Sequence, residues 1–474
     1  MKISSGEYFF FAWANRLIDP RSKRALPEWY KGTAIPEIRP VDIEALSSHR
    51  YWEKWDRVTP EQIEATGKAF FERLWSMQAA APECLLFDTT NYYTYMGSPT
   101  TSDLCARGHN KAGKHHLRQV GLALLVDRVT ELPLFYEVYE GNTHDATVFR
   151  RVIDEMFGIL CGFNQTKQRL TVVFDKGMNS PEAIRTIDDH PRVHFITTYS
   201  PHFVEELAGT DLKRFSPLGS QNAEGDDVLA FRTRAPLWEQ ERTVVVTYNP
   251  KTARKKRYTL DQKLEVLRTT LLEYRRAFRE RQPHWRDPDA IRERYLRECE
   301  RLHIGAQYYR LEFAQSDPPE MSFRKDLYQI GKSEALFGRN VIVTDNHDWT
   351  TEEIVKRCLD RSRVEKQFRD SKSSDHVRVN PFFHWTDGKI RCHLLTCVIA
   401  LVALRLIEQT VNANRGSDPL SGRTILDEMR RLHSTCLWYP GRRDAERVVE
   451  TPEKTQAEAL HAFGYQIEDG CPGT

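Results

Sequence analysis

The sequence has 474 residues, more than one hydrophobic core usually supports, so we expect more than one domain. Hydrophobic residues make up 40% and charged residues 29% of the chain, which is typical of a folded globular protein and excludes wholesale disorder. The 69 lysines and arginines and the 67 aspartates and glutamates leave a net charge of +2. A nucleic-acid partner would therefore need a local basic surface.

Cysteine usage and apolar runs bear on the compartment. The nine cysteines are odd in number and include no Cys-x-x-Cys pair, which favours a reduced, cytoplasmic protein. The N-terminal stretch MKISSGEYFFFAWANRL contains only a short aromatic patch, so we read no secretory signal there. The most apolar later run, residues 394–407, is shorter than the roughly 20 residues of a membrane span and predicts a buried core helix.

The elements predicted up to residue 200 follow an α/β order. Residues 1–58 give no clear period, and Thr59 with Gln62 then forms a capping box that predicts a helix start. Apolar runs and turn residues then predict strands and helices in this order: a strand at 84–90, a hairpin of strands at 119–128 and 132–141, a helix at 144–157, a strand at 169–178, a helix at 180–189 and a strand at 193–200. This order predicts a mixed sheet with an antiparallel start and a parallel finish.

The α/β alternation stops after residue 200. Strands are predicted at 226–234, 242–250 and 340–346, and charged helices at 259–282 and 289–303. We interpret residues 201–346 as an insertion into an α/β core. The predicted domains are therefore an N-terminal region of lead-in helices (1–80), the first part of the core (81–200), the insertion (201–346), the second part of the core (347–412) and a C-terminal helical region (413–474).

A predicted helix after the insertion carries ions in the middle of an apolar face. Thr350 and Glu353 form a second capping box, which predicts that the helix starts there. An exposed ion pair at i,i+4 would contribute only about a few tenths of a kcal/mol and would leave the apolar ends of this face in water. We therefore predict a functional cleft below the middle of the helix. The face consists of Ile354, Cys358, Arg361, Glu365 and Phe368, followed by Lys372.

Two aspartates could share this cleft with Glu365. Asp88 and Asp175 each follow a run of apolar strand residues, where a buried carboxylate is costly unless it meets a cation or several donors. For either aspartate alone, capping of the next turn is the simpler interpretation. Together, the three carboxylates match the ligands that a pair of Mg²⁺ ions requires for chemistry on a phosphodiester. Arg361 and Lys372 would then hold the flanking phosphates.

This pattern resembles the DDE transposases of bacterial insertion sequences. The helix is similar to their tyrosine, arginine, glutamate, lysine signature, because Arg361 precedes Glu365 by four residues and Lys372 follows it by seven. The tyrosine of the signature falls on Cys358, a departure that puts contacts to the transposon end in doubt. The two aspartates of the family correspond to Asp88 and Asp175. The segments GHNK (108–111), EGNTHDATVF (140–149) and VNPFFHWTDGKIRCH (379–393) also look like relatives' sequences, so the resemblance spans about residues 80–410.

The resemblance implies a fold, an activity and a set of partners. The implied fold is α/β, a ribonuclease H-like mixed sheet flanked by helices, with a large α+β insertion before the catalytic helix. Asp88, Asp175 and Glu365 would be catalytic and would bind two Mg²⁺ ions, for which Mn²⁺ could substitute. Water would cleave a phosphodiester at the transposon end, and the freed 3′ hydroxyl would attack target DNA. The implied partners are double-stranded DNA, both terminal inverted repeats and target, and a second copy of the chain in a synaptic homodimer in the bacterial cytoplasm, at the nucleoid.

Two other hypotheses stay open at this point. The chain could be a relic that binds DNA without cutting it, because Cys358 replaces the tyrosine and the region before Asp88 looks short for end recognition. It could also be a metal-dependent nuclease that does not transpose. Among weaker candidates, Asp145 is interpreted as the cap of its helix. We expect packing or positioning roles for His384, His393 and Trp385.

Overall fold

The chain divides into two compact units. One unit contains residues 1–195 and 359–474, and the other contains residues 196–358. The computed structural model describes residues 3–78, 82–97, 100–108, 113–162, 169–221, 227–314, 316–380, 383–416, 418–441, 446–465, 467–468 and 471–472. Residues 109–111 of the segment GHNK and 381–382 of the segment that starts at Val379 lie outside this description.

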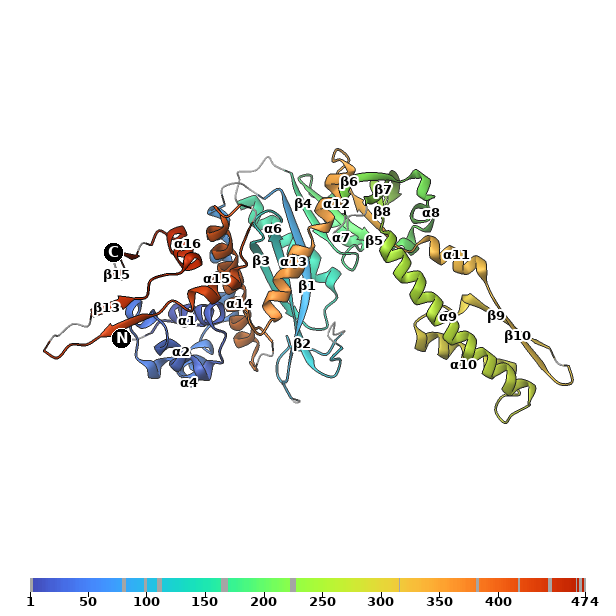
Figure 1. The fold of residues 1–474 in the computed structure, drawn as a ribbon, viewed down its shortest axis with the longest axis horizontal. Coiled ribbons are helices and arrows are strands. Elements are labelled where there is room, and N and C mark those ends of the chain that lie inside the picture. Colours follow the sequence, from blue (N-terminus) through green and yellow to red (C-terminus); the bar gives the residue numbers. More distant parts are fainter. Residues whose placement is uncertain are drawn as a thin grey trace. The chain divides into compact units, whose positions relative to one another are not determined.

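The first unit contains a mixed sheet with the strand order β3-β2-β1-β4-β5, in which β5 continues into the second unit (Figure 1). Strand β1 pairs antiparallel with β2 and parallel with β4, and β2 pairs antiparallel with β3. The prediction of a mixed α/β fold with a large mixed sheet flanked by helices is confirmed. The elements match those predicted from the sequence: β1 Cys84–Thr94, β2 Arg118–Asp127, β3 Pro133–Glu140, α6 Asp145–Gly162, β4 Leu170–Phe174, α7 Pro181–Asp188 and β5 Val193–Tyr199.

Helices cover both faces of this sheet. Successive side chains of a strand point to opposite faces. The ring of Phe87 in β1 lies 5.0 Å from that of Phe149 in α6, whereas the hydroxyl of Tyr92 lies 2.6 Å from Oγ of Ser371 in α13 (Ser362–Lys372). Because Phe87 and Tyr92 are an odd number of residues apart, α6 and α13 cover opposite faces. Asp88, four residues before Tyr92, therefore points to the face that α13 covers.

The N-terminal region is helical, although its sequence showed no clear period. Helix α1 starts at a capping box formed by Ser4 and Glu7, which the sequence analysis missed. Aromatic and aliphatic side chains are buried around most of α1, so no single apolar face stands out. This region packs through Phe11, Tyr51 and Trp55 against α14 (Asp387–Asn412). Its elements are α1 Ser5–Ile18, α2 Leu26–Lys31, α3 Ile35–Ile38, α4 Ser48–Trp55 and the predicted helix α5 Pro60–Ser76, with short 3-10 turns at Lys23–Ala25 and Ile43–Leu46.

Helix α14, Asp387–Asn412, is the core helix predicted from the apolar run at 394–407. By length and composition alone it could cross a membrane, with a mean hydropathy of 2.0 over its most apolar window. In this structure 72% of that window is buried inside the protein, as expected for the central helix of a folded core. The chain after it forms α15 Gly422–Met429, β12 Ser434–Leu437, β13 Glu446–Val449, α16 Lys454–Ala462, β14 Ile467–Glu468 and β15 Cys471–Pro472.

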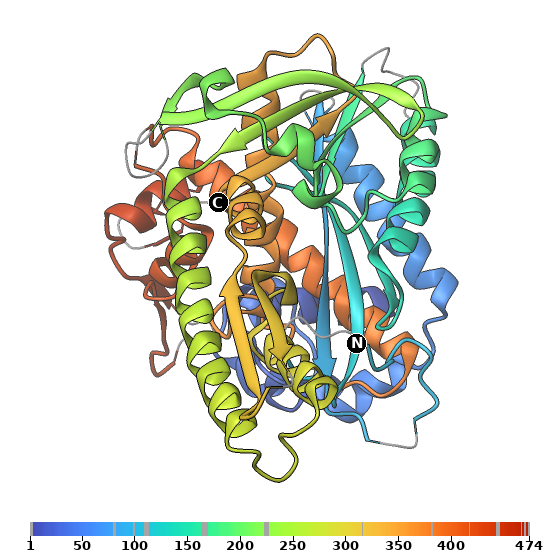
Figure 2. The ribbon, with the colours of Figure 1, turned by 90° about the vertical axis from the view of Figure 1, so that its right-hand side faces the viewer.

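The second unit has antiparallel strands and its own helical core. Strand β11 pairs with β5 and with β8, and β7 pairs with β8 and β6. The long helix α9 runs beside the hairpin of β9 and β10 (Figure 2). The elements are β6 Ser216–Gln221, β7 Asp227–Leu237, β8 Gln240–Tyr248, α9 Pro250–Arg279, α10 Pro288–Leu302, β9 Tyr309–Ala314, β10 Glu320–Lys325, α11 Leu327–Ala335 and β11 Arg339–Thr344, with short turns of helix at Pro201–Phe203, Glu205–Ala208 (α8), Leu212–Arg214 and Ala306–Tyr308.

Helix α9 begins nine residues before the predicted start at residue 259. The side chain of Asn249 caps it by accepting a hydrogen bond from the backbone of Thr252. The basic stretch at 251–257 is therefore the first two turns of a helix. The start was predicted too late because this stretch carries few apolar residues.

The helix predicted from Thr350 to Lys372 is broken, so the prediction of one continuous face was wrong. Helix α12 covers Thr351–Leu359, and α13 starts only at Ser362. Asp360 and Arg361 form the turn between them. The carboxylate of Asp360 is held by Arg128 at 3.0 Å and by Arg363 at 3.3 Å, which fixes the turn.

Candidate active site

The structure brings Asp88 and Asp175 to neighbouring positions on paired strands. Leu86 in β1 lies opposite Val173 in β4, and the pairing is parallel. Two residues further along each strand, Asp88 lies beside Asp175, just after the end of β4. Asp88 accepts a hydrogen bond from the backbone N–H of Thr89, and Asp175 accepts one from that of Lys176, each at 2.8 Å. The two carboxylates are thus fixed close together at the edge of the buried part of the sheet.

Arg361 connects Asp175 to Glu365. Its Nη1 lies 3.5 Å from Oδ2 of Asp175, and its Nη2 lies 3.2 Å from Oε1 of Glu365. The side chain of Glu365 is 53% exposed and that of Asp175 is 38% exposed, whereas that of Arg361 is 22% exposed. The start of α13 therefore lies at the aspartates, with Glu365 in the first turn of the helix.

Lys372 lies at the other end of α13, against β1. Its Nζ donates a hydrogen bond to Oγ1 of Thr90 at 2.5 Å and lies 5.7 Å from the ring centre of Tyr92. Thr90 is two residues beyond Asp88 and points to the same face of the sheet. A guanidinium therefore lies just before the start of α13, at Arg361, and an ammonium lies at its end, at Lys372.

The chemistry of these side chains suits a hard divalent cation. Within the described ranges, no group of three or more histidine, cysteine, aspartate or glutamate side chains is close enough to hold a metal ion. The three predicted carboxylates nevertheless offer only oxygen ligands, which Mg²⁺ and Mn²⁺ prefer. A guanidinium lies against two of them in this structure. Asp88, Asp175 and Glu365 are the predicted residues that would hold a metal ion.

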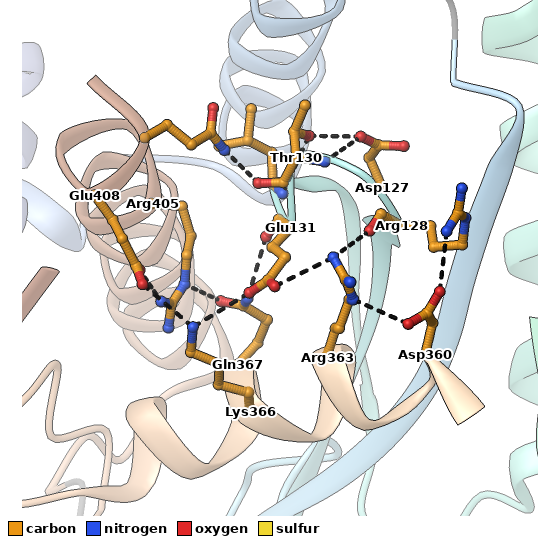
Figure 3. Close-up of polar contacts among 12 residues, drawn as sticks. Asp127, Arg128, Thr130, Glu131, Asp360, Arg363, Lys366, Gln367, Arg405 and Glu408 are labelled. Carbon is orange, nitrogen blue, oxygen red and sulfur yellow. Dashed lines mark hydrogen bonds and ion pairs between the residues drawn. The ribbon is translucent and has the colours of Figure 1, made fainter. Parts of the chain in front are cut away.

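A network of ions fixes α13 to the turn between β2 and β3 (Figure 3). The carboxylate of Glu131 in this turn lies 3.4 Å from Nη1 of Arg363 and 3.3 Å from Nζ of Lys366. The backbone carbonyl of Glu131 accepts a hydrogen bond from the amide of Gln367 at 3.1 Å. These contacts involve the side of α13 that does not carry Glu365, so they set its position without occupying the carboxylates.

The same network continues into α14 through a buried arginine. Arg405 is 3% exposed, donates to Oε1 of Gln367 at 3.1 Å and forms ion pairs with Asp370 and Glu408. Glu408 also lies 3.3 Å from Nζ of Lys366. The sequence analysis missed this network. The one available signal was an arginine inside the most apolar run of the chain, where a charge needs a buried partner.

The weaker candidates have mixed outcomes. His384 and His393 are buried with ring centres 4.4 Å apart, which confirms packing roles, and burial holds the pKa of both well below the ordinary value. Trp385 is 65% exposed, so the prediction of a packing role for it was wrong, and a positioning role stays a prediction. Asp145 is the first residue of α6, the helix on the opposite face of the sheet from Asp88. Cys358, at the position of the signature tyrosine, is buried.

Comparison with known families decides the identity of the fold. The family described as transposase DDE domain matches residues 94–403, well over half of the chain. The chain belongs to this transposase family. The predicted resemblance to DDE transposases is thus confirmed. Asp175 and Glu365 lie within the matched residues of the transposase, and Asp88 lies six residues before the first matched residue, residue 94.

Solved structures similar to this transposase are themselves transposases. The piggyBac transposase in a synaptic complex with hairpin DNA is 10% identical, with a TM-score of 0.40, over 91% of this chain and 72% of that chain. The Mos1 transposase in a paired-end complex with the left transposon end is 12% identical, with a TM-score of 0.18, over 44% of this chain and 63% of that chain. A Mos1 mariner paired-end complex with Mn is 12% identical, with a TM-score of 0.16, over 41% and 59%. No curated protein matches the chain.

Proposed function

We propose that this transposase cleaves DNA strands at the ends of a bacterial insertion sequence and joins the freed 3′ ends to target DNA. The observation that carries the proposal is the placement of Asp88 beside Asp175, with Glu365 connected to Asp175 through Arg361. This arrangement occurs in a chain that belongs to the transposase DDE domain family. It supplies three carboxylates and two flanking cations, which suit a phosphodiester substrate.

The proposed chemistry consists of two displacements at phosphorus. In the first, a water oxygen bonds to the phosphorus at the transposon end, and the bond to the 3′ oxygen breaks and leaves a 3′ hydroxyl. In the second, that hydroxyl attacks a phosphodiester of target DNA, whose own 3′ oxygen leaves. A pair of divalent metal ions, preferably Mg²⁺ with Mn²⁺ as a substitute, would lower the barrier of both steps by activating the attacking oxygen and stabilising the leaving one.

The residues of the chain divide the remaining tasks. Asp88, Asp175 and Glu365 would hold the metal ions. Lys372, which is fixed at Thr90 two residues beyond Asp88, would bind a phosphate that flanks the cleaved bond. Arg361 would bind a second phosphate, since a guanidinium can contact two phosphate oxygens at once.

The proposed partners follow from this chemistry. They are double-stranded DNA, as terminal inverted repeats and as target, and a second copy of the chain that pairs the two ends in a homodimer. We place the reaction at the nucleoid, in the bacterial cytoplasm.

A DNA-binding relic without cleavage activity is the second candidate. The specific observation in its favour is Cys358, which stands where the signature has a tyrosine and whose side chain is buried. A buried thiol lacks the aromatic ring and hydroxyl with which a tyrosine could contact the DNA end.

Strand cleavage tests both candidates. The substrate is flanking duplex DNA that contains a terminal inverted repeat of the insertion sequence. It is incubated with the full chain and either Mg²⁺ or Mn²⁺. We expect metal-dependent nicking by the wild type and none by Asp88→Ala, Asp175→Ala or Glu365→Ala. Glu182→Ala, which removes an exposed carboxylate on α7, is the matched control and should nick normally. DNA binding without any nicking by the wild type would favour the relic.

A further inference from the structure

The guanidinium of Arg361 lies between two of the three predicted metal ligands. It contacts Oδ2 of Asp175 and Oε1 of Glu365, one carboxylate on each side. Asp88, beside Asp175 on the neighbouring strand, adds a third carboxylate. Carboxylates that share a site repel one another, and the repulsion is relieved by a cation among them. In this structure Arg361 places a cation between Asp175 and Glu365.

Arg361 has fewer partners than its neighbour Arg363. Among the residues that the structure describes, its guanidinium makes ion pairs only with Asp175 and Glu365, both of which are partly exposed. Arg363 contacts Glu131, Asp360 and the backbone carbonyl of Arg128. Arg361 also lies in the turn between α12 and α13, outside both helices. Its contacts with the carboxylates can therefore break without loss of a structural contact.

A metal ion and this guanidinium compete for the same oxygens. A divalent cation needs carboxylate oxygens at about 2.0–2.6 Å, which excludes a guanidinium from between them. Once displaced, the guanidinium keeps its charge and becomes available to a phosphate. Displacement by metal would thus prepare the phosphate contact, and the two binding events would favour each other.

We propose that Arg361 is a displaceable counter-ion of the metal site, which occupies Asp175 and Glu365 in the free protein and moves to a DNA phosphate when metal binds. The inference rests on the proposed function, because it requires a metal ion at these carboxylates. If Arg361 is such a counter-ion, its effect on metal affinity changes sign when DNA binds. A permanent phosphate contact or a structural role would not cause this change. Without DNA, Arg361 opposes metal binding, and with DNA it supports metal binding.

The test measures Mn²⁺ binding to the full chain without DNA. The electron paramagnetic resonance signal of free Mn²⁺ monitors this binding. Arg361→Gln removes the charge and keeps a similar length, and we expect it to bind Mn²⁺ about threefold to tenfold more tightly than the wild type, since two partly exposed ion pairs no longer compete. Arg369→Gln removes the same charge from an exposed position on α13 and should stay within about twofold of the wild type. Thermal melting of each variant verifies folding.

Further arms separate failure of the inference from failure of the proposed function. If Mn²⁺ binding is lost in Asp88→Ala and Asp175→Ala but is unchanged or weaker in Arg361→Gln, Arg361 is not a competing counter-ion and the proposed function stands. If no binding depends on the aspartates, the proposed function fails and the inference with it. If Arg361→Gln does not fold, Arg361→Lys serves instead. Lysine keeps the charge but lacks the planar fork whose separate nitrogens face the two carboxylates, so we expect a smaller gain in affinity, and no gain would overturn the inference.

With a 20-base-pair duplex present, the order of the Mn²⁺ affinities of the wild type and Arg361→Gln should change. DNA should raise the Mn²⁺ affinity of the wild type more than that of Arg361→Gln, because only the wild type has an arginine that gains a phosphate when metal binds. An equal increase in both proteins would contradict the coupling.

Discussion

At the scale of single residues, the candidate carboxylates differ in how far the fold depends on them. Asp175 follows directly after a buried strand, whereas Glu365 is the most exposed of the ion-paired groups at the site and pairs with Arg361 in the turn just before its own helix. An exposed i,i+4 ion pair contributes little to stability. If replacing Glu365 has a large effect on the reaction, Glu365 therefore takes part in the reaction and not in holding the fold.

Glu365→Gln should abolish DNA nicking and leave the fold intact. We expect its free energy of unfolding, measured by urea denaturation, to stay within about 0.5 kcal/mol of the wild type. Glu352→Gln, an exposed carboxylate on α12, is the control for both measurements. A loss of more than about 2 kcal/mol in Glu365→Gln would instead indicate a structural residue.

Lys372 and Lys366 lie on the same helix with different surroundings. Lys372 contacts Thr90 beside the aspartates, while Lys366 is paired with Glu131 and Glu408. Lys372→Ala should weaken DNA binding and reduce the slope of log affinity against log salt by about one, because one phosphate contact is lost. Lys366→Ala should leave the slope unchanged. Equal slopes for Lys372→Ala and the wild type would remove the proposed phosphate contact.

Glu137 gives the fold a defined pH dependence. Its burial in β3, reinforced by nearby Glu155, raises its pKa from 4.5 to about 7. Between these two values the folded protein holds a proton that the unfolded chain has released, so stability falls as pH rises through this range and levels off above pH 7. Glu137→Gln removes this dependence. From pH 4.5 to 7.5, the wild type should lose on the order of 2 kcal/mol more than Glu137→Gln in urea denaturation. Parallel pH profiles would show that the carboxylate stays ionised in the fold.

At the scale of elements, α13 is positioned by charges rather than by an apolar face alone. Its contacts with the β2–β3 turn and with α14 run through Glu131 and Arg405 (Figure 3). A buried ion network is a weak source of net stability, but loss of one member leaves other charges buried without compensation. The network therefore fixes the position of the helix more than it adds stability.

Arg405→Met should destabilise the protein by about 3 kcal/mol, because Asp370 and Glu408 lose their cation. Adding Asp370→Asn should recover part of this loss, since one of the uncompensated charges is removed. Arg431→Met, at an exposed arginine paired with Glu428, should change the free energy of unfolding by less than about 0.5 kcal/mol. Additive losses from the Arg405 and Asp370 variants would contradict a direct interaction between the two.

At the scale of the whole molecule, each unit has its own core. The core of the second unit consists of side chains from α9, α10 and the β9–β10 hairpin, with Leu271 fully buried at its centre. The candidate carboxylates all belong to the first unit. Stability of the second unit and metal binding by the first should therefore be separable.

Leu271→Ala should cost the second unit about 3 kcal/mol and leave Mn²⁺ binding unchanged. The measurement is amide hydrogen exchange, in which protection should fall in α9 and α10 but not in β1. Val266→Ala, at an exposed position of the same helix, should change neither. An equal loss of protection in β1 would show that the two units unfold together.

Local sequence determined most of the elements and the spacing of the candidate residues. Thr59 with Gln62 and Thr350 with Glu353 form the capping boxes that their spacing predicted, because a capping box depends on residues only three apart. The strands of the α/β core were also predictable, since each is a short apolar run between turns. The catalytic roles of Asp88, Asp175 and Glu365 stay a prediction.

Only the tertiary structure decided how α13 is placed and what meets at its start. The break between α12 and α13 depends on Arg128, which holds Asp360 from 232 residues away. The proximity of Asp88 to Asp175 depends on the register of β1 against β4, and the position of Arg361 depends on both strands. Side chains so distant along the chain leave no periodic signal in the sequence, because their contacts arise only when the sheet and the helices pack together.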